Sequence, residues 1–163
     1  MRRTTRRWRT PPAISHGAEA YEGLAVLEEV KGPLGFLLWQ VARDVTLWAT
    51  FPPEERAELF VPGAEATLHG LVRSTGVDVQ LESPLMTIVR MVGAPDVARP
   101  EAVELACQHI AHWADGHGYS ATAVAFAQAA AMTVPFDAGA AYAVGRIARR
   151  RAEHSRAETW FRR

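Results

Sequence analysis

Cysteine is nearly missing from this sequence: Cys107 stands alone, so no disulfide can form within the chain. A small secreted fold held together by disulfides is therefore excluded. No apolar run approaches the roughly 18 to 20 residues that cross a bilayer, because the longest, residues 33–39, is followed by Arg43 and Asp44. The basic N-terminus also lacks the apolar core of a secretory signal. These absences predict a cytoplasmic protein without a membrane span.

Lysine is scarce as well, since Lys31 is the only one among the 18 basic residues. We interpret this preference for arginine, together with the alanine-rich segments, as the bacterial-like composition of a GC-rich source. The 163 residues are 48% hydrophobic and 22% charged, a balance that excludes a wholly disordered chain. This length fits one compact domain or part of a larger protein.

Motifs that carry catalysis are absent from the sequence too. There is no glycine-rich phosphate loop, no nucleophile elbow and no zinc-binding HExxH. Two pairs of consecutive glutamates, at 28–29 and 54–55, diverge on a helix and cannot act together as acid and base. We therefore expect a protein without enzymatic activity and without a cofactor, in which Trp39 and Trp48 belong to a helix core.

The formal net charge of zero conceals a segregation of charge along the chain. Residues 1–15 carry five arginines and no acid, whereas residues 16–143 carry sixteen acidic and six basic residues. Residues 144–163 carry seven arginines and two glutamates. The sequence thus predicts a flexible basic arm over residues 1–15, an acidic body and a basic C-terminal end.

Helical periodicity, interrupted by glycine and proline, predicts an all-α fold. The segment 34–49 has only two charges, so we expect it to be the most buried helix. Residues 77–81 alternate as in a strand, but no partner strand is evident. The expected helices cover 18–30, 34–49, a short segment from Pro53, 64–74, a segment capped by Ser83-Pro84 that reaches Met91, and a segment from Pro100 onwards.

The C-terminal third of the chain aligns with itself at an offset of 34 residues. The large–small pair Ile110-Ala111 then aligns with Val144-Gly145. Small residues allow two antiparallel helices to approach closely, and a large neighbour fills the space that remains. Three alanines recur at this spacing: Ala106 with Ala140, Ala114 with Ala148, and Ala123 with Ala157.

With this period and these positions, residues 104–163 resemble the tetratricopeptide repeat (TPR) family. The resemblance implies a helix pair over 104–117 and 119–133, with Ser120 capping its second helix, and a second pair over 138–151 and 153–163. We thus expect an irregular helical bundle over residues 16–100, followed by TPR-like antiparallel hairpins of an α-solenoid over residues 101–163. The second repeat stops within a helix, so we expect a truncated repeat whose end is covered by further repeats or by another chain.

In this family the first helix of each unit lines a groove that binds protein or peptide partners. The resemblance therefore implies a scaffold or adaptor that acts through protein–protein interaction. In the second unit a tyrosine and three arginines share one helical face. This face suits an acidic segment or a chain-terminal carboxylate, because arginine binds carboxylate through two hydrogen bonds. The alternative for this face is a solvated charged surface. The implied contact residues are Gln108, His112, Asp115, Tyr142, Arg146, Arg149 and Arg150, with Leu105 and Gly139 beside them.

Two further interpretations arise from single residues. A metal site at Cys107, His109 and His112 is not expected, because Cys107 faces away from the histidines and no second cluster completes a shell.

The N-terminal arm, with Trp8 among its arginines, has the charge and the ring to bind phosphate and stack on bases. The alternative function is therefore a regulatory nucleic-acid-associated protein, although the acidic body would repel phosphate and the arm could fold onto that body instead. The arginines concerned are Arg2, Arg3, Arg6, Arg7 and Arg9.

Overall fold

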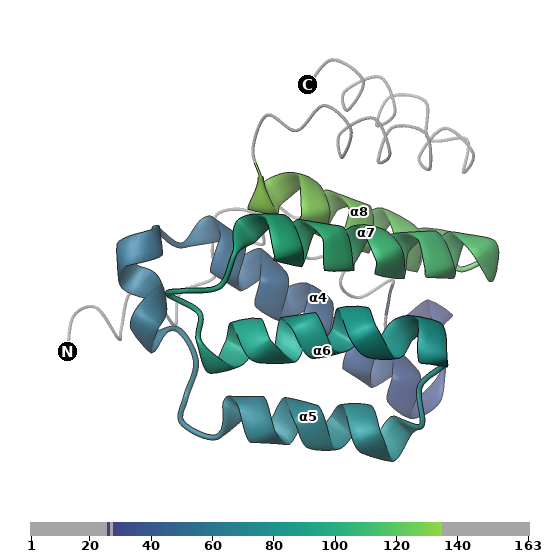
Figure 1. The fold of residues 1–163 in the computed structure, drawn as a ribbon. Coiled ribbons are helices and arrows are strands. Elements are labelled where there is room, and N and C mark those ends of the chain that lie inside the picture. The colour runs from purple at the N-terminus through teal and green to yellow at the C-terminus, as the bar shows by residue number, and fades with distance from the viewer. Residues whose placement is uncertain (1–25, 27, 135–163) are drawn as a thin grey trace.

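The computed structural model describes Val26 and residues 28–134 (Figure 1). The arginine-rich arm, most of the helix expected over 18–30 and the second repeat unit lie outside these residues. The expectations for those segments therefore stay predictions.

Six helices make up the described residues, in which no strand occurs. The all-α class expected from the sequence is confirmed for this part of the chain. None of these helices has both the length and the apolar character that a membrane span requires. The helices are α4 (Gly32–Thr50), the 3₁₀ helix η1 (Pro53–Glu58), α5 (Ala64–Thr75), α6 (Val79–Gly93), α7 (Pro100–Gly116) and α8 (Ser120–Thr133).

The helices α5, α6, α7 and α8 form a row in which each helix packs on the next (Figure 1). Helix α4 lies behind this row and contacts α5, α6 and α8. A single apolar core, from Val26 to Ala130, includes side chains of all five α-helices. Within the described residues this core is continuous across the division expected near residue 100, since α6 packs on α7 and α4 packs on α8.

Helix α4 confirms the helix predicted over 34–49 and extends it slightly at both ends. Pro33 stands in its first turn, where a missing backbone N–H costs no hydrogen bond. Trp48 is fully buried as expected, whereas Trp39 is only half-buried. The fully buried side chains form a broad stripe along one face of the helix: Leu37, Leu38, Val41, Val45 and Trp48.

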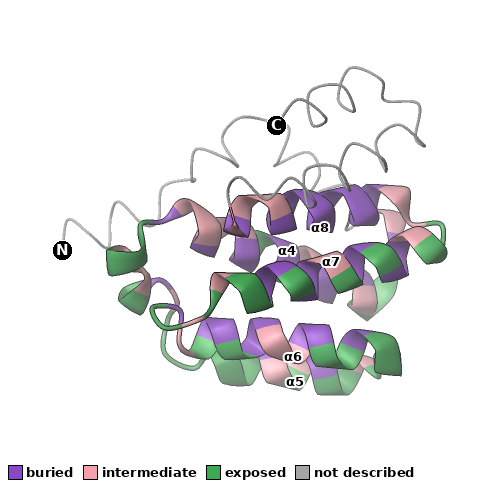
Figure 2. Ribbon diagram, turned by 45° about the horizontal axis from the view of Figure 1, so that its top comes forward, coloured by how far each residue is buried: buried purple, intermediate pink, exposed green. Residues whose placement is uncertain are grey.

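Helix α8, and not α4, is the most buried helix, so the expectation about burial is wrong. Every residue from 121 to 130 is buried, as the purple of α8 in Figure 2 shows, whereas α4 exposes Phe36 and Arg43. Helix α8 contains no charged residue, and its many alanines let α4 and α7 approach it closely. The absence of charged residues and the short side chains of α8 therefore both favour its burial.

Residues 77–81 do not form a strand, and the predicted start of the next helix at Ser83-Pro84 is also wrong. The Asp78 carboxylate accepts a hydrogen bond from the Gln80 backbone N–H at 2.9 Å, which begins α6 at Val79. Pro84 lies inside the helix. Proline at this position removes one intrahelical hydrogen bond, and α6 continues through it to Gly93.

The starts predicted at Pro53 and Pro100 are confirmed, and α5 matches the segment expected over 64–74. The segment from Pro53 is a 3₁₀ helix, with Glu54 and Glu55 in its first turn. Carboxylates there are favoured by the positive end of the helix dipole.

Helices α7 and α8 form the antiparallel pair expected for the first repeat unit, joined by the turn 117–119 (Figure 1). The small residues that recur along the sequence lie between the helices of this bundle. The repetition of the pair lies outside the described residues. The buried members of the pattern are Ala106, Ile110, Ala111, Ala114 and Ala123.

The turn after α7 is closed by two backbone hydrogen bonds of the Schellman type. The Gly118 N–H donates to the Asp115 carbonyl at 3.2 Å, and the Tyr119 N–H donates to the Ala114 carbonyl at 2.8 Å. Gly118 has φ +80°, in the left-handed region that glycine adopts without steric cost. The turn therefore depends on glycine at this position.

Gly118→Ala is expected to lower the free energy of unfolding by about 1–2 kcal/mol, because alanine is strained in the left-handed region. Urea denaturation followed by circular dichroism measures this loss. Gly116→Ala is the matched control, since a Cβ at Gly116 meets nothing within 4 Å. This control is expected to be neutral or to stabilise by about 0.5–1 kcal/mol. Equal losses in both variants would contradict the role of Gly118.

Ser120 does not cap α8, so that prediction is wrong: Ser120 is the first residue of the helix, and the N-cap Tyr119 makes no side-chain cap. The carboxylate of Glu29 takes this role instead. Its Oε1 accepts from the Ala121 N–H at 3.2 Å, and its Oε2 accepts from the Thr122 N–H and hydroxyl, both at 2.8 Å. A carboxylate satisfies the free N–H groups of a helix N-terminus and interacts favourably with its dipole. A side chain that precedes α4 therefore fixes the start of α8.

Candidate partner-binding surface

The outer face of α7 carries the site residues predicted for the first repeat unit. Leu105 has an exposed fraction of 53%, and His112 is exposed as well. Gln108 and Asp115 are half-buried. The spacing of these four residues, three or four apart, places them on one side of the helix. The structure therefore brings the predicted residues of α7 together on an accessible face.

The opposite side of α7 is fixed in the core. Val103, Cys107 and Ile110 are almost completely buried there. Glu104 is buried too, and its Oε1 accepts a hydrogen bond from the Gln108 side-chain amide at 2.8 Å. This hydrogen bond restrains Gln108 at the margin of the outer face.

An aromatic cluster fixes the end of α7. The Trp113 and His117 rings stack with centroids 4.4 Å apart, and the Tyr119 ring lies 5.9 Å from Trp113. The His117 Nδ1 lies 2.8 Å from the Trp113 carbonyl oxygen, to which it donates when Nδ1 carries the proton. The buried indole Nε1 of Trp113 has no hydrogen-bond partner among the described residues. The stacking and the turn together hold this end of the outer face rigid.

The residues considered for a metal site do not meet. Cys107 is buried while His109 and His112 are exposed on the other side of α7, as the sequence indicated. Burial raises the pKa of the Cys107 thiol, and the neighbouring Glu104 raises it further. Within residues 28–134 no group of three metal-binding side chains occurs. Cys107 therefore acts as a small apolar side chain of the core.

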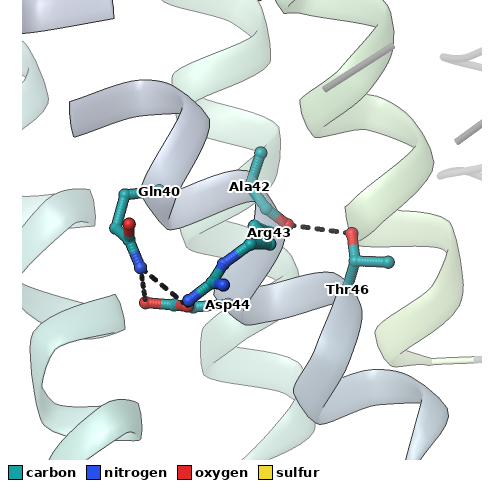
Figure 3. A network of polar contacts seen from close by, with 5 residues as sticks. All are labelled: Gln40, Ala42, Arg43, Asp44 and Thr46. Carbon is teal, nitrogen blue, oxygen red and sulfur yellow. Dashed lines mark hydrogen bonds and ion pairs between the residues drawn. The ribbon is translucent and has the colours of Figure 1, made fainter. Parts of the chain in front are cut away.

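A buried carboxylate in α4 is a feature that sequence reasoning did not single out. Asp44 is only 4% exposed, and its Oδ1 accepts from the Gln40 amide and from the Arg43 guanidinium, both at 3.2 Å (Figure 3). Burial raises the pKa of Asp44, and the charge of Arg43 and the hydrogen bonds from Gln40 and Arg43 oppose this. The network keeps a charge at the margin of the core at a cost in stability.

Asp44→Asn is expected to gain stability relative to wild type as the pH rises above about 4. The folded-state pKa of Asp44 lies above its ordinary value of 3.8, so the folded chain holds this proton more tightly than the unfolded chain. Stability is therefore lost as the pH rises through the folded pKa, and asparagine removes that loss. Urea denaturation of both proteins between about pH 3 and pH 8 measures the difference. A difference that is constant over this range would contradict the expectation.

The remaining predicted site residues lie outside the described part of the chain. They are Tyr142, Arg146, Arg149 and Arg150 of the second unit, and Arg2, Arg3, Arg6, Arg7 and Arg9 of the arm.

The described part of the chain is strongly acidic. Residues 28–134 carry thirteen acidic and six basic residues, so most of the arginines lie in the flanking segments. A polyanion is repelled by such a body unless a local group of cations attracts it.

Comparisons of the chain with protein-family models, with curated proteins and with solved structures find no significant match.

Proposed function

We propose that the chain is a scaffold or adaptor for protein–protein interaction and that it binds its partner along the outer face of α7. The observation that carries this proposal is a helix with one side fixed in the core and the other side open, where Leu105 and His112 are exposed. An apolar side chain on a rigid helix gains free energy when a partner covers it, at little cost in conformational entropy.

The α7–α8 pair is, in this proposal, the first unit of a TPR-like solenoid. The support is the burial of the small residues of the 34-residue pattern, such as Ala106 and Ala123. The second unit then continues the binding face with Tyr142, Arg146, Arg149 and Arg150. Its arginines suit an acidic partner segment, because a guanidinium pairs with a carboxylate through two hydrogen bonds.

Binding of nucleic acid by the N-terminal arm has weaker support. The acidic excess of residues 28–134 repels phosphate and opposes the five arginines of the arm. Salt-dependent binding of DNA or RNA that is lost on deletion of residues 1–15 would favour this alternative.

Charge reversal in the second unit tests the proposal. Arg146→Glu combined with Arg149→Glu is expected to reduce the amount of partner that the intact chain retains from an extract of source cells by about tenfold or more. The physical reason is that two attractive charges become repulsive ones at the interface. Quantitative mass spectrometry of the retained proteins measures the loss.

The matched control is Arg73→Glu combined with Arg90→Glu. Both arginines are exposed, on α5 and α6, and the control changes the net charge by the same amount. A partner retained equally by both double variants would contradict binding through the basic face.

A further inference from the structure

A second surface, separate from α7, lies on the outer side of α4. Phe36, Trp39 and Arg43 follow one another at intervals of three and four residues and therefore share one face. Phe36 is 46% exposed, and the Arg43 side chain is 45% exposed. The Phe36 and Trp39 rings lie 6.3 Å apart, and the Arg43 guanidinium lies 5.7 Å from the Trp39 ring centre. We refer to these three residues as the α4 stripe.

Arg43 is held in place at two points. One Nη contacts the Asp44 carboxylate at 3.2 Å, and the guanidinium carbon lies over Trp39 (Figure 3 shows the contact with Asp44). Among the described residues Arg43 has no further hydrogen-bond partner, and its side chain is 45% exposed. A side chain already held in one geometry loses little conformational entropy when it binds a carboxylate.

The beginning of α4 adds a second positive region. Lys31 and Gly32 are exposed, and the first turn contains no acidic residue and no side-chain cap. The free N–H groups and the dipole of a helix start favour a negative group. Between residues 30 and 43 the only charged side chains are Lys31 and Arg43. The rings of the α4 stripe thus lie between the start of α4 and Arg43, which is paired with the buried Asp44.

We infer that the α4 stripe is a binding site for an acidic protein segment in which carboxylates flank large apolar side chains. The apolar side chains pack on Phe36 and Trp39, and the carboxylates bind Arg43 and the start of α4. These two positive groups are separated by about 16 Å along the helix. An extended segment of about five residues covers this distance. A protein segment fits better than nucleic acid, because the surrounding acidic excess repels a continuous phosphate backbone.

The probe is a fluorescently labelled synthetic peptide with two aspartates on each side of a leucine–phenylalanine–leucine core. Its binding to the full chain is measured by fluorescence anisotropy at low and at high salt. We expect saturable binding that weakens with salt and that is lost when asparagine replaces the aspartates. The variants Phe36→Ala and Arg43→Lys are each expected to weaken binding about tenfold, as truncation of an aromatic or arginine anchor does.

The variants are chosen so that the fold survives. Phe36→Ala removes a side chain that is about half exposed, and Arg43→Lys keeps a cation beside Asp44. Arg90→Gln, on the exposed side of α6, is the matched control and should bind the peptide as wild type does. Equal binding by all variants, no binding of the acidic peptide, or stronger binding of a single-stranded oligonucleotide would each overturn the inference. Self-association of the chain that is lost in Phe36→Ala would also overturn it, since a second copy would then occupy the stripe.

Discussion

Trp48→Ala is expected to lower the free energy of unfolding by about 4 kcal/mol, the largest effect among the variants considered. The Trp48 side chain is fully buried at the end of α4, and truncation of such a residue leaves a large cavity. Its Nε1 donates to the Pro95 carbonyl at 2.6 Å, in the segment between α6 and α7. The Arg56 guanidinium lies 4.2 Å from its ring centre. Trp48 therefore joins α4, η1 and the approach to α7, and urea denaturation should show the loss directly.

Trp48→Phe separates the hydrogen bond from the packing. Phenylalanine retains most of the buried aromatic volume but leaves the Pro95 carbonyl without its donor, so a loss of about 1–3 kcal/mol is expected. A loss below about 1 kcal/mol for Trp48→Ala would contradict the placement of this side chain in the core.

Glu29→Ala is expected to lower the free energy of unfolding by about 3 kcal/mol. The substitution removes the carboxylate that accepts from two backbone N–H groups and one hydroxyl at the start of α8. Ala121 and Thr122 are buried, so their N–H groups would lose a charge-assisted hydrogen bond without access to much water. Urea denaturation measures the loss.

Glu28→Ala is the matched control for Glu29→Ala, because it removes the same side chain at an exposed neighbouring position. A change within about 0.5 kcal/mol is expected there. Thr122→Val, which removes only the hydroxyl, should give a smaller loss of about 1 kcal/mol. Equal effects of the two glutamate substitutions would contradict the contact between Glu29 and α8.

Local signals in the sequence predicted most of the helix positions. Pro53 and Pro100 begin helices, because proline acts through its own backbone geometry. The start of α6 was missed although its signal is also local. Asp78 is a strong N-cap, but the alternation of Val77, Val79 and Leu81 favoured a strand.

Sequence patterns did not predict the contacts between segments that are far apart in the chain. The cap of α8 comes from Glu29, and no spacing rule connects residues so far apart in the chain. The two tryptophans of α4 illustrate the same limit, since Trp48 is fully buried while Trp39 is half-buried beside Arg43. A helix that is apolar on several faces does not reveal which face meets the core.

The candidate surface on α7 was predicted in part. The resemblance to the repeat family indicated Gln108, His112 and Asp115, and the structure places them on one accessible side of the helix. The α4 stripe was not predicted, because its aromatic residues were assigned to the core.

Site-specific photo-crosslinking tests the central proposal, that α7 binds a protein partner, most directly. A photoreactive amino acid is placed at Leu105 or at His112 of the full chain, and, as the control, at the exposed Ala66 of α5. The proposal predicts that both α7 positions crosslink to the same protein in source cells and that Ala66 does not. Crosslinking of that protein with equal yield at all three positions, or crosslinking at α7 to nucleic acid, would contradict it.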